Sequence, residues 1–336
     1  MNTDIISATG QADPGSVIDD LRRRIDSELK SLVPTSPPDE LYEPARYVLD
    51  GSGKRVRPTL LLLAANVWDT TFDAALPAAL GIEVFHTFTL VHDDIMDHSD
   101  ERRGRETVHV KWDESTAILV GDYLHGLSYD LLAQTDTHNL SAIVRTFHRM
   151  VAKVCEGQAL DKAFENRREV SVQDYFDMIY AKTGALIECA MELGGLISGA
   201  PEDQVNALRS AGRHIGRAFQ LQDDLLDITA DDARWGKPIG GDLIEGKKTF
   251  ILLRAIERAE GADRAWFQKI VEENGLAAQL VPEARERLMR LGILEEAAQA
   301  VEHHSKEALS RIAQLPACEA SQTLTYLVDS MRRRLH

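Results

Sequence analysis

The sequence predicts an all-α protein, one large helical bundle, and three observations support this prediction. Apolar residues recur with helical spacing along most of the 336 residues. Sustained alternation of apolar and polar residues, the pattern of a half-buried strand, is almost absent. No composition shift or Gly/Ser/Pro-rich linker divides the chain. We therefore expect a disordered segment over residues 1–15, followed by a single catalytic domain over 16–336.

The expected helices can be followed in order along the first third of the chain. In the segment 16–33, apolar residues are spaced four apart from Val17 to Leu29, and PTSPP then stops the helix. A Gly-containing loop over 49–58 enters the apolar helix TLLLLAANVW. Pro77 can occupy the first turn of the next helix, which runs through FHTFTLVHDDIMD.

The remainder of the chain also has helical patterns. STAILVGDYLHGLSYDLLA and SAIVRTFHRMVAKVCEGQAL show the expected periodicity. Ser171 and Asp174 are spaced as in a capping box, and they open a helix that continues to Gly199. Another helix begins at Pro201 and ends in FQLQDDLLDITAD, and several shorter amphipathic helices follow over 249–335.

Composition restricts the partners and the compartment. The formal charge of −16 argues against nucleic acid and anionic membranes, because the protein would repel phosphate. No apolar run approaches the roughly 18 residues that span a bilayer, so no stable membrane insertion is expected. The three cysteines form no CxxC pair and the polar N-terminus lacks a signal-peptide pattern, which predicts a cytoplasmic protein. Cys155 and Cys189 are expected to be buried, and His303 and His304 to be solvated.

Two clusters of aspartates interrupt otherwise apolar helices. They are Asp93, Asp94 and Asp97 in DDIMD, and Asp223, Asp224 and Asp227 in DDLLD. Residues four apart share a helix face, so the first and last aspartate of each cluster converge. Mg²⁺ takes one or two carboxylates and completes its shell with water and substrate phosphates. A single cluster could be a solvated acidic turn, but two copies inside apolar helices favour a metal site.

Basic residues in glycine-containing segments indicate an anionic substrate. They are Lys54, Arg55 and Arg57 in GSGKRVRP, Arg102 and Arg103 after the first aspartate cluster, and Lys182, Lys237, Lys247 and Lys248. Arginine can bind phosphate oxygens in a bidentate way, and lysine supplies a point charge. Each residue alone is more often a surface charge. Their arrangement with two acidic clusters favours a phosphate-bearing ligand.

This ordered set of motifs resembles the trans-isoprenyl diphosphate synthases, the polyprenyl synthetase family. The motifs are GSGKRVRP, DDIMD with RRG, EGQ, KTG, FQLQDDLLD and GKPIGGD, and they cover about residues 50–250. The resemblance implies helices around a central substrate cavity, a homodimer, and a short-chain synthase of the geranylgeranyl or farnesyl type. Such an enzyme joins isopentenyl diphosphate to an allylic diphosphate after Mg²⁺-assisted ionisation, with about three Mg²⁺ ions balancing the two diphosphates.

The resemblance also implies roles for individual residues. The Mg²⁺ ligands would be Asp93, Asp97 and Asp223, with Asp94 and Asp227 as supporting acids. The allylic diphosphate would be held by Arg102, Lys182, Gln220, Lys237 and Lys247, and isopentenyl diphosphate by Lys54, Arg57, His86 and Arg103. Thr183 would place a hydroxyl near the developing cation.

Phe88 and Thr89 are the expected chain-length residues. Phe88 precedes Asp93 by five positions, about 7.5 Å along a helix, so its ring could close the cavity below the first aspartate. From periodicity alone, an ordinary core residue is the better interpretation of Phe88. The resemblance favours a cavity floor, and one aromatic here resembles geranylgeranyl more than farnesyl diphosphate synthases.

Two other functions remain open at this stage. A class I terpene cyclase also ionises a diphosphate at a DDxxD cluster on an all-α fold. Such cyclases usually carry N/D-x-x-S/T-x-x-x-E where this chain has QDDLLD. A non-catalytic regulatory subunit of a prenyl synthase would be expected to have degraded acidic motifs, and both motifs are intact here.

Overall fold

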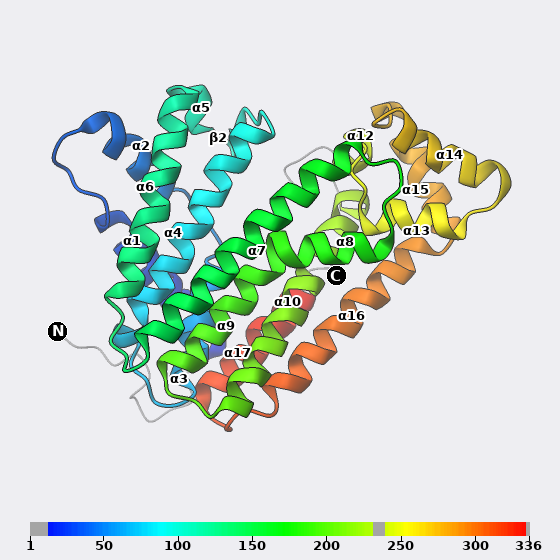
Figure 1. The fold of residues 1–336 in the computed structure, drawn as a ribbon. Helices are drawn as coiled ribbons and strands as arrows, with labels where there is room; N and C mark the ends of the chain where they lie inside the picture. The colour runs from blue at the N-terminus through cyan, green and yellow to red at the C-terminus, as the bar shows by residue number, and fades with distance from the viewer. Residues whose placement is uncertain (1–12, 231–238, 334–336) are drawn as a thin grey trace. The chain divides into compact units, whose positions relative to one another are not determined.

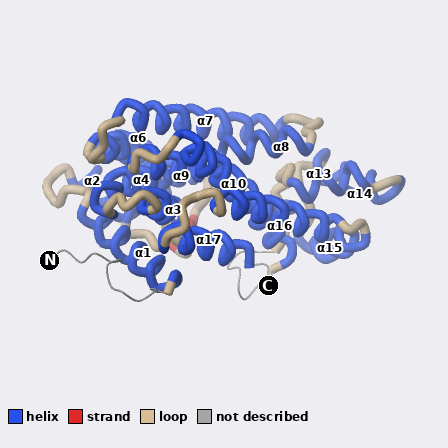
Figure 2. The backbone as a smooth tube through the Cα atoms, turned by 90° about the horizontal axis from the view of Figure 1, so that it is seen from below, coloured by secondary structure: helices blue, strands red, loops and turns tan. Residues whose placement is uncertain are grey.

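The computed structural model describes residues 13–230 and 239–333, and within these ranges it confirms the all-α class (Figures 1 and 2). Residues 1–12 of the segment predicted to be disordered lie outside the described residues. The first helix begins at Pro14, two residues earlier than predicted, and the Asp13 side chain caps it by accepting from the Ser16 amide.

The structure contains the following elements in chain order. They are α1 (Pro14–Ser31), α2 (Asp39–Leu49), α3 (Val56–Asn66), α4 (Phe72–Met96), β1 (Glu101–Arg102), β2 (Arg105–Glu106), α5 (Val108–Lys111), α6 (Glu114–Ala133), α7 (Leu140–Asn166), α8 (Val172–Ile179), the π-helix η1 (Tyr180–Gly184), α9 (Ala185–Ile197), α10 (Glu202–Thr229), α12 (Gly241–Ile244), α13 (Phe250–Arg258), α14 (Gly261–Glu272), the 3₁₀-helix η2 (Ala278–Leu280), α15 (Val281–Arg290), α16 (Ile293–Ile312) and α17 (Glu319–Arg332).

The chain divides into two compact units. Unit 1 comprises Met1–His148, Cys189–Arg209 and Ile312–Leu327, and unit 2 comprises Arg149–Glu188, Ser210–Arg311 and Val328–His336. The single domain expected over residues 16–336 stays a prediction.

In unit 1, the apolar helices α3 and α4 form the centre, and α4 lies along α6 (Figure 1). Gly81 of α4 permits this approach, since a Cβ there would lie 3.0 Å from the Ser128 carbonyl oxygen. The predicted start of this helix at Pro77 is wrong: α4 begins at Phe72, and Pro77 lies inside it. Thr71 provides the start signal, because its hydroxyl accepts from the Ala74 amide.

Helix α4 is an exception to the expectation that no apolar run is long enough to span a bilayer. Among the described residues it is the helix long and apolar enough to cross a membrane, with 25 residues. However, 61% of its apolar window is buried inside the protein. We therefore interpret α4 as a core helix.

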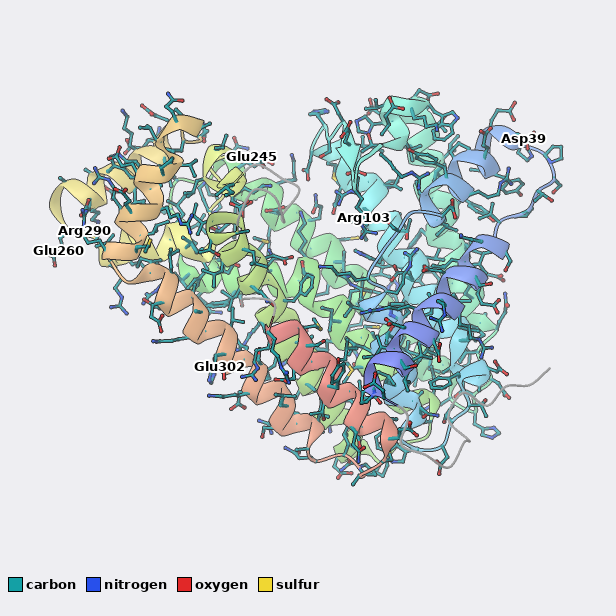
Figure 3. All side chains as sticks on the ribbon, turned by 180° about the vertical axis from the view of Figure 1, so that it is seen from behind. Asp39, Arg103, Glu245, Glu260, Arg290 and Glu302 are labelled. Carbon is teal, nitrogen blue, oxygen red and sulfur yellow. The ribbon has the colours of Figure 1, made fainter. Side chains whose placement is uncertain are left out.

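A short β-hairpin follows the first aspartate cluster, where the sequence indicated no strand. Glu101 pairs with Glu106, and Arg102 with Arg105. Arg103 and Gly104 between them have φ values of 55° and 73°. Positive φ at both central residues is the requirement of a type I′ turn, so the hairpin turn places Arg103 at its tip (Figure 3).

In unit 2, a buried apolar core gathers α8, the second half of α10 and helices α13 to α16. The predicted capping box is confirmed, because Ser171 and Asp174 cap α8 reciprocally. Two expectations about the exposure of side chains are wrong, those for Cys155 and His304. Cys189 is buried as expected, but Cys155 on α7 is exposed. His303 is exposed as expected, whereas His304 is half-buried.

His304 on α16 packs against His214 on α10. Their Nδ1 atoms are 3.1 Å apart, so one imidazole donates a hydrogen bond to the other. The accepting imidazole must be neutral, and only the donating imidazole can carry a charge. Burial, together with the charges of His214, Arg217 and His303, lowers the pKa of His304 to about 4.

The folded protein should therefore lose stability in acid through His304. Between pH 6.5 and about 4 the unfolded chain binds a proton at this histidine and the folded chain does not, so the free energy of unfolding falls as the pH falls. We expect the decrease over this range to be about 2 kcal/mol larger in the wild type than in His304→Phe. Urea titrations at pH 7 and pH 4.5 measure the difference, and equal decreases in both proteins would contradict it.

Candidate active site

The first aspartate cluster ends α4 in unit 1, and its three carboxylates have different surroundings. Asp94 is buried, and its Oδ1 accepts from Arg102 Nε at 2.7 Å. Burial raises the pKa of Asp94, and the Arg102 guanidinium opposes that rise. Asp93 is half-buried and Asp97 is exposed. The outer two carboxylates are thus the ones that solvent and a hydrated cation can reach.

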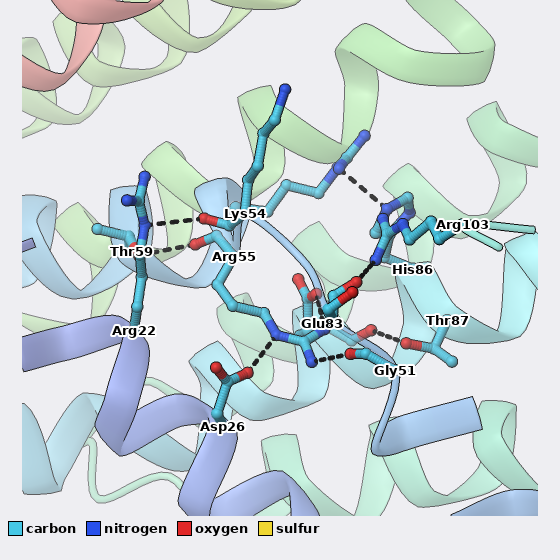
Figure 4. A network of polar contacts seen from close by, with 12 residues as sticks. Arg22, Asp26, Gly51, Lys54, Arg55, Thr59, Glu83, His86, Thr87 and Arg103 are labelled. Atoms are coloured by element: carbon cyan, nitrogen blue, oxygen red, sulfur yellow. Dashed lines mark hydrogen bonds and ion pairs between the residues drawn. The ribbon is translucent and has the colours of Figure 1, made fainter. Parts of the chain in front are cut away.

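The GSGKRVRP loop is anchored in unit 1 by Arg55. Its guanidinium donates to Asp26 at 2.7 Å, to Glu83 at 2.8 Å and to the Gly51 carbonyl at 2.6 Å (Figure 4). Arg55 has a left-handed backbone, with φ of 46°. This conformation turns Arg55 inward, while the Lys54 side chain points away from the Arg55–Glu83 pair (Figure 4).

A pocket of about 80 Å³ beside this loop brings together residues predicted for isopentenyl diphosphate. His86 and Arg103 line it, together with Arg102, which was predicted for the allylic diphosphate. Arg57 Nη1 lies 3.1 Å from His86 Nε2, and Arg103 donates to the Ser52 carbonyl. Burial, followed by the charges of Arg57, Arg103 and Arg102, holds the pKa of His86 well below its usual value. The neutral imidazole therefore accepts from Arg57 and fixes its position.

The second aspartate cluster lies near the end of α10 in unit 2 and repeats the arrangement of the first. The middle residue, Asp224, is buried, whereas Asp223 and Asp227 are half-buried. Asp227 Oδ2 accepts from the Asp242 amide at 3.2 Å, at the start of α12. Burial raises the pKa of Asp224 to about 6, and hydrogen bonds from Tyr175 and Gln220 oppose that rise.

Unit 2 contains a pocket of about 530 Å³ lined by most of the residues predicted for the allylic diphosphate. Lys182, Gln220 and Lys247 are among them, and Thr183, which was predicted to lie near the developing cation, also lines the pocket. Lys182 Nζ lies 2.5 Å from Asp161. Lys247 Nζ lies 2.6 Å from Glu245 (labelled in Figure 3) and 3.8 Å from Asp242. Carboxylates thus neutralise the cations that are predicted to bind phosphate.

A π-helix presents Lys182 and Thr183 to this pocket. η1 interrupts the helix that the sequence predicted to run unbroken to Gly199. Glycines permit close packing on η1: a Cβ on Gly157 of α7 would lie 2.3 Å from the Lys182 nitrogen, and one on Gly216 of α10 would lie 2.6 Å from Gly184 Cα. Single π-turns of this kind are frequent at functional sites.

Phe88 belongs to an aromatic cluster in unit 1. Its ring centroid lies 5.3 Å from Phe85, 4.8 Å from His92 and 5.1 Å from His125 on α6. Thr89 is half-buried, and its hydroxyl donates to the His86 carbonyl at 2.8 Å. Phe88 itself is half-buried.

The structure differs from the predicted site at several residues. Lys237 lies outside the described residues. Arg102, predicted for the allylic diphosphate, lines the unit 1 pocket beside His86. Asp161 and Asp242 were not predicted, although GKPIGGD contains Asp242. Lys248, one of the basic residues that indicated an anionic substrate, donates to the Phe164 carbonyl at 2.6 Å and is buried.

Comparisons with known proteins agree with this arrangement. The family model described as "Polyprenyl synthetase" matches residues 38–288. The chain belongs to the polyprenyl synthetase family. A geranylgeranyl diphosphate synthase of Methanosarcina mazei is 40% identical over 253 residues, which cover 74% of this chain and 78% of that protein. A geranylfarnesyl diphosphate synthase of Natronomonas pharaonis is 36% identical, with coverage of 95% and 97%.

A solved structure of the family shows the same fold. The geranylgeranyl pyrophosphate synthetase of Pyrococcus horikoshii Ot3 is 34% identical, has a TM-score of 0.88, and is matched over 95% of this chain and 99% of that one. The resemblance indicated by the motifs is thereby confirmed. Nothing in these comparisons supports a terpene cyclase or a non-catalytic subunit.

Polyprenyl synthetases use a divalent metal for diphosphate ionisation, and the carboxylates of this chain fit such an ion. Among residues 13–230 and 239–333, no group of three or more His, Cys, Asp or Glu side chains could hold a metal ion unaided. Each cluster instead offers two accessible carboxylates one helical turn apart. This donor set suits Mg²⁺, which needs one or two carboxylates when waters and substrate phosphates complete its shell.

Proposed function

We propose that this polyprenyl synthetase is a short-chain trans-prenyl diphosphate synthase that joins isopentenyl diphosphate to an allylic diphosphate and releases inorganic diphosphate. The supporting observation is the repeated carboxylate arrangement. In each unit a buried middle aspartate is flanked by two accessible ones, and each unit contains a pocket lined by basic residues.

In this proposal the residues of unit 2 hold the allylic substrate. Lys182, Lys237 and Lys247 hold its diphosphate, and Asp161 and Glu245 give up their lysines when it binds. About three Mg²⁺ ions, held by Asp93, Asp97, Asp223 and the supporting acids, would supply the charge that draws the diphosphate away as the C–O bond breaks.

The residues of unit 1 hold the second substrate. Lys54, Arg57 and Arg103 bind the diphosphate of isopentenyl diphosphate, and His86 keeps Arg57 in place. The double bond of this substrate attacks the allylic cation, and loss of one proton regenerates an allylic product. No serine, cysteine or histidine nucleophile is needed, since the chemistry consists of ionisation and electrostatic stabilisation.

Geranylgeranyl diphosphate is the product we favour, and the protein is proposed to act as a cytoplasmic homodimer. The M. mazei relative is named for this product. The N. pharaonis relative, at similar identity, is named for geranylfarnesyl diphosphate. Overall identity therefore does not decide chain length, and the cavity residues must.

Phe88→Ala should lengthen the products, and Thr89→Phe should shorten them. Removing the Phe88 ring opens space beside His125, whereas Thr89→Phe adds a ring at the next position of α4. Chromatography of the dephosphorylated prenols measures the shift. Phe88→Tyr keeps a ring and serves as the control. An unchanged distribution in both variants would mean that the cavity floor lies elsewhere.

The two diphosphate sites should respond separately to mutation. Arg57→Ala should raise the KM for isopentenyl diphosphate by about tenfold, and Lys182→Ala the KM for the allylic substrate by a similar factor. Titrating each substrate at saturating levels of the other measures both constants. Equal effects on both substrates in both variants would refute the division.

The function itself is tested with purified protein, Mg²⁺, an allylic diphosphate and labelled isopentenyl diphosphate. Label in a longer prenyl diphosphate supports the proposal. A cyclic hydrocarbon without label would indicate a cyclase. No product until a homologous partner is added would indicate a regulatory subunit.

A further inference from the structure

Tyr175 of α8 is an almost fully buried tyrosine whose hydroxyl meets a carboxylate. Its side chain packs against the rings of Phe176 and Phe250 and is 1% exposed. The hydroxyl donates to Asp224 Oδ2 at 2.5 Å. The partners are 49 residues apart in the sequence, and both lie in unit 2.

Asp224 has both of its oxygens engaged inside the protein. Oδ2 accepts from Tyr175, and Oδ1 accepts from Gln220 Nε2 at 3.1 Å. It is 4% exposed, unlike its neighbour Asp223. Both oxygens of the middle aspartate of this cluster are therefore occupied by hydrogen bonds from Tyr175 and Gln220.

The carboxylate of Asp224 determines which way the Gln220 amide faces. An ionised carboxylate only accepts hydrogen bonds, so the NH₂ group of Gln220 must face it. The amide oxygen then faces the opposite way, where Oε1 accepts from the Thr183 hydroxyl at 3.3 Å. Tyr175, Asp224, Gln220 and Thr183 thus form one directed series of hydrogen bonds.

The polarity of this series suits a cation in the pocket. The Thr183 hydroxyl hydrogen points to Gln220, so the oxygen lone pairs of Thr183 are left for a ligand. Gln220 and Thr183 both line the 530 Å³ pocket, together with Met178 and Ile179. The oxygen dipoles of Gln220 and Thr183 are fixed before the reaction. They can therefore stabilise a developing positive charge without the cost of reorienting these side chains.

We propose that Tyr175 is a positioning residue for carbocation formation, acting through Asp224 on the orientation of Gln220 and Thr183. This inference rests on the proposed function. The hydroxyl of Tyr175 touches no substrate. Its effect is to hold the carboxylate that fixes the dipoles facing the allylic carbon.

Steady-state kinetics of Tyr175→Phe, Asp224→Asn and the double variant test this role. We expect kcat to fall about tenfold in Tyr175→Phe, less than for loss of a group that touches the reacting atoms. Both KM values and the Mg²⁺ half-saturation should stay within about twofold. Adding Tyr175→Phe to Asp224→Asn should change kcat by less than about twofold, because the two residues act in series. Tyr326→Phe, an exposed tyrosine of α17, is the matched control.

A readout without substrate or metal uses NMR of the Gln220 side-chain amide, assigned by its absence in Gln220→Glu. Hydrogen exchange of this amide should be faster in Asp224→Asn and Tyr175→Phe than in the wild type, and unchanged in Tyr326→Phe. A purely structural role for Tyr175 would lower the melting temperature without altering this amide or kcat.

Several results would overturn the inference. A wild-type kcat in folded Tyr175→Phe would do so. A kcat in the double variant that is reduced by the product of the two single-variant factors would also do so. A loss confined to Mg²⁺ half-saturation would show that Asp224 serves the metal instead. An inert wild-type protein would refute the proposed function, whereas an active wild type with unaffected variants would refute this inference alone.

Discussion

Asp93→Ala and Asp223→Ala should each reduce turnover by about a hundredfold or more, with the protein still folded. Each variant removes one accessible carboxylate from its cluster and leaves the buried middle aspartate in place. The ion that the cluster holds would then be misplaced relative to the leaving diphosphate. Because these carboxylates are half-buried, their loss should cost little folding free energy. Turnover at saturating Mg²⁺ and the melting temperature are the two measurements.

Asp136→Ala is the matched control for these variants. Asp136 is an exposed aspartate in the loop after α6, outside both clusters. Its removal should leave turnover within about twofold of the wild type, as for a typical surface substitution. Near-normal turnover in Asp93→Ala or Asp223→Ala would contradict the assignment of the metal ligands.

Arg55→Ala should lower the free energy of unfolding by roughly 3–5 kcal/mol. Arg55 and Glu83 are both buried, with side chains 5% exposed, and their ion pair is 2.8 Å long. Without the guanidinium, the carboxylate of Glu83 remains buried and loses its partner. The Gly51 carbonyl and Asp26 also lose a donor, so the loop that carries Lys54 and Arg57 should loosen.

Urea unfolding of two further variants separates charge from packing. Arg22→Ala, which removes a contact to the Lys54 carbonyl in the same loop, should cost less than about 1 kcal/mol because Arg22 is partly exposed. Arg55→Met with Glu83→Leu should recover much of the loss, since no buried charge remains. A loss below 1 kcal/mol in Arg55→Ala would mean that water or another cation reaches Glu83.

The helices and the acidic clusters could be predicted from the sequence because they depend on local spacing. Apolar residues four apart define a buried face, and aspartates four apart share a face wherever the helix lies. The roles of neighbouring basic residues could not be predicted in this way. Arg55 points inward and Lys54 away from it because Arg55 has a left-handed backbone, which no pattern in GSGKRVRP specifies.

The missed features depend on contacts between distant segments. The π-helix at 180–184 is packed between Gly157 and Gly216, and its own sequence, YAKTG, contains no signal for it. Asp224 resembles its neighbours in DDLLD, yet a tyrosine 49 residues earlier makes it a structural acid. Pro77 was misleading as a start signal because the Thr71 cap lies six residues further upstream.

A double-label experiment tests the central claim most directly, because it asks which diphosphate leaves. The allylic substrate carries ³²P in its diphosphate, and isopentenyl diphosphate carries ¹⁴C in its carbon chain. With Mg²⁺ present, we predict a longer prenyl diphosphate that contains ¹⁴C and no ³²P, with one labelled inorganic diphosphate released for each molecule of allylic starter consumed. Release of ³²P without incorporation of ¹⁴C, or a product that retains ³²P, would contradict the account.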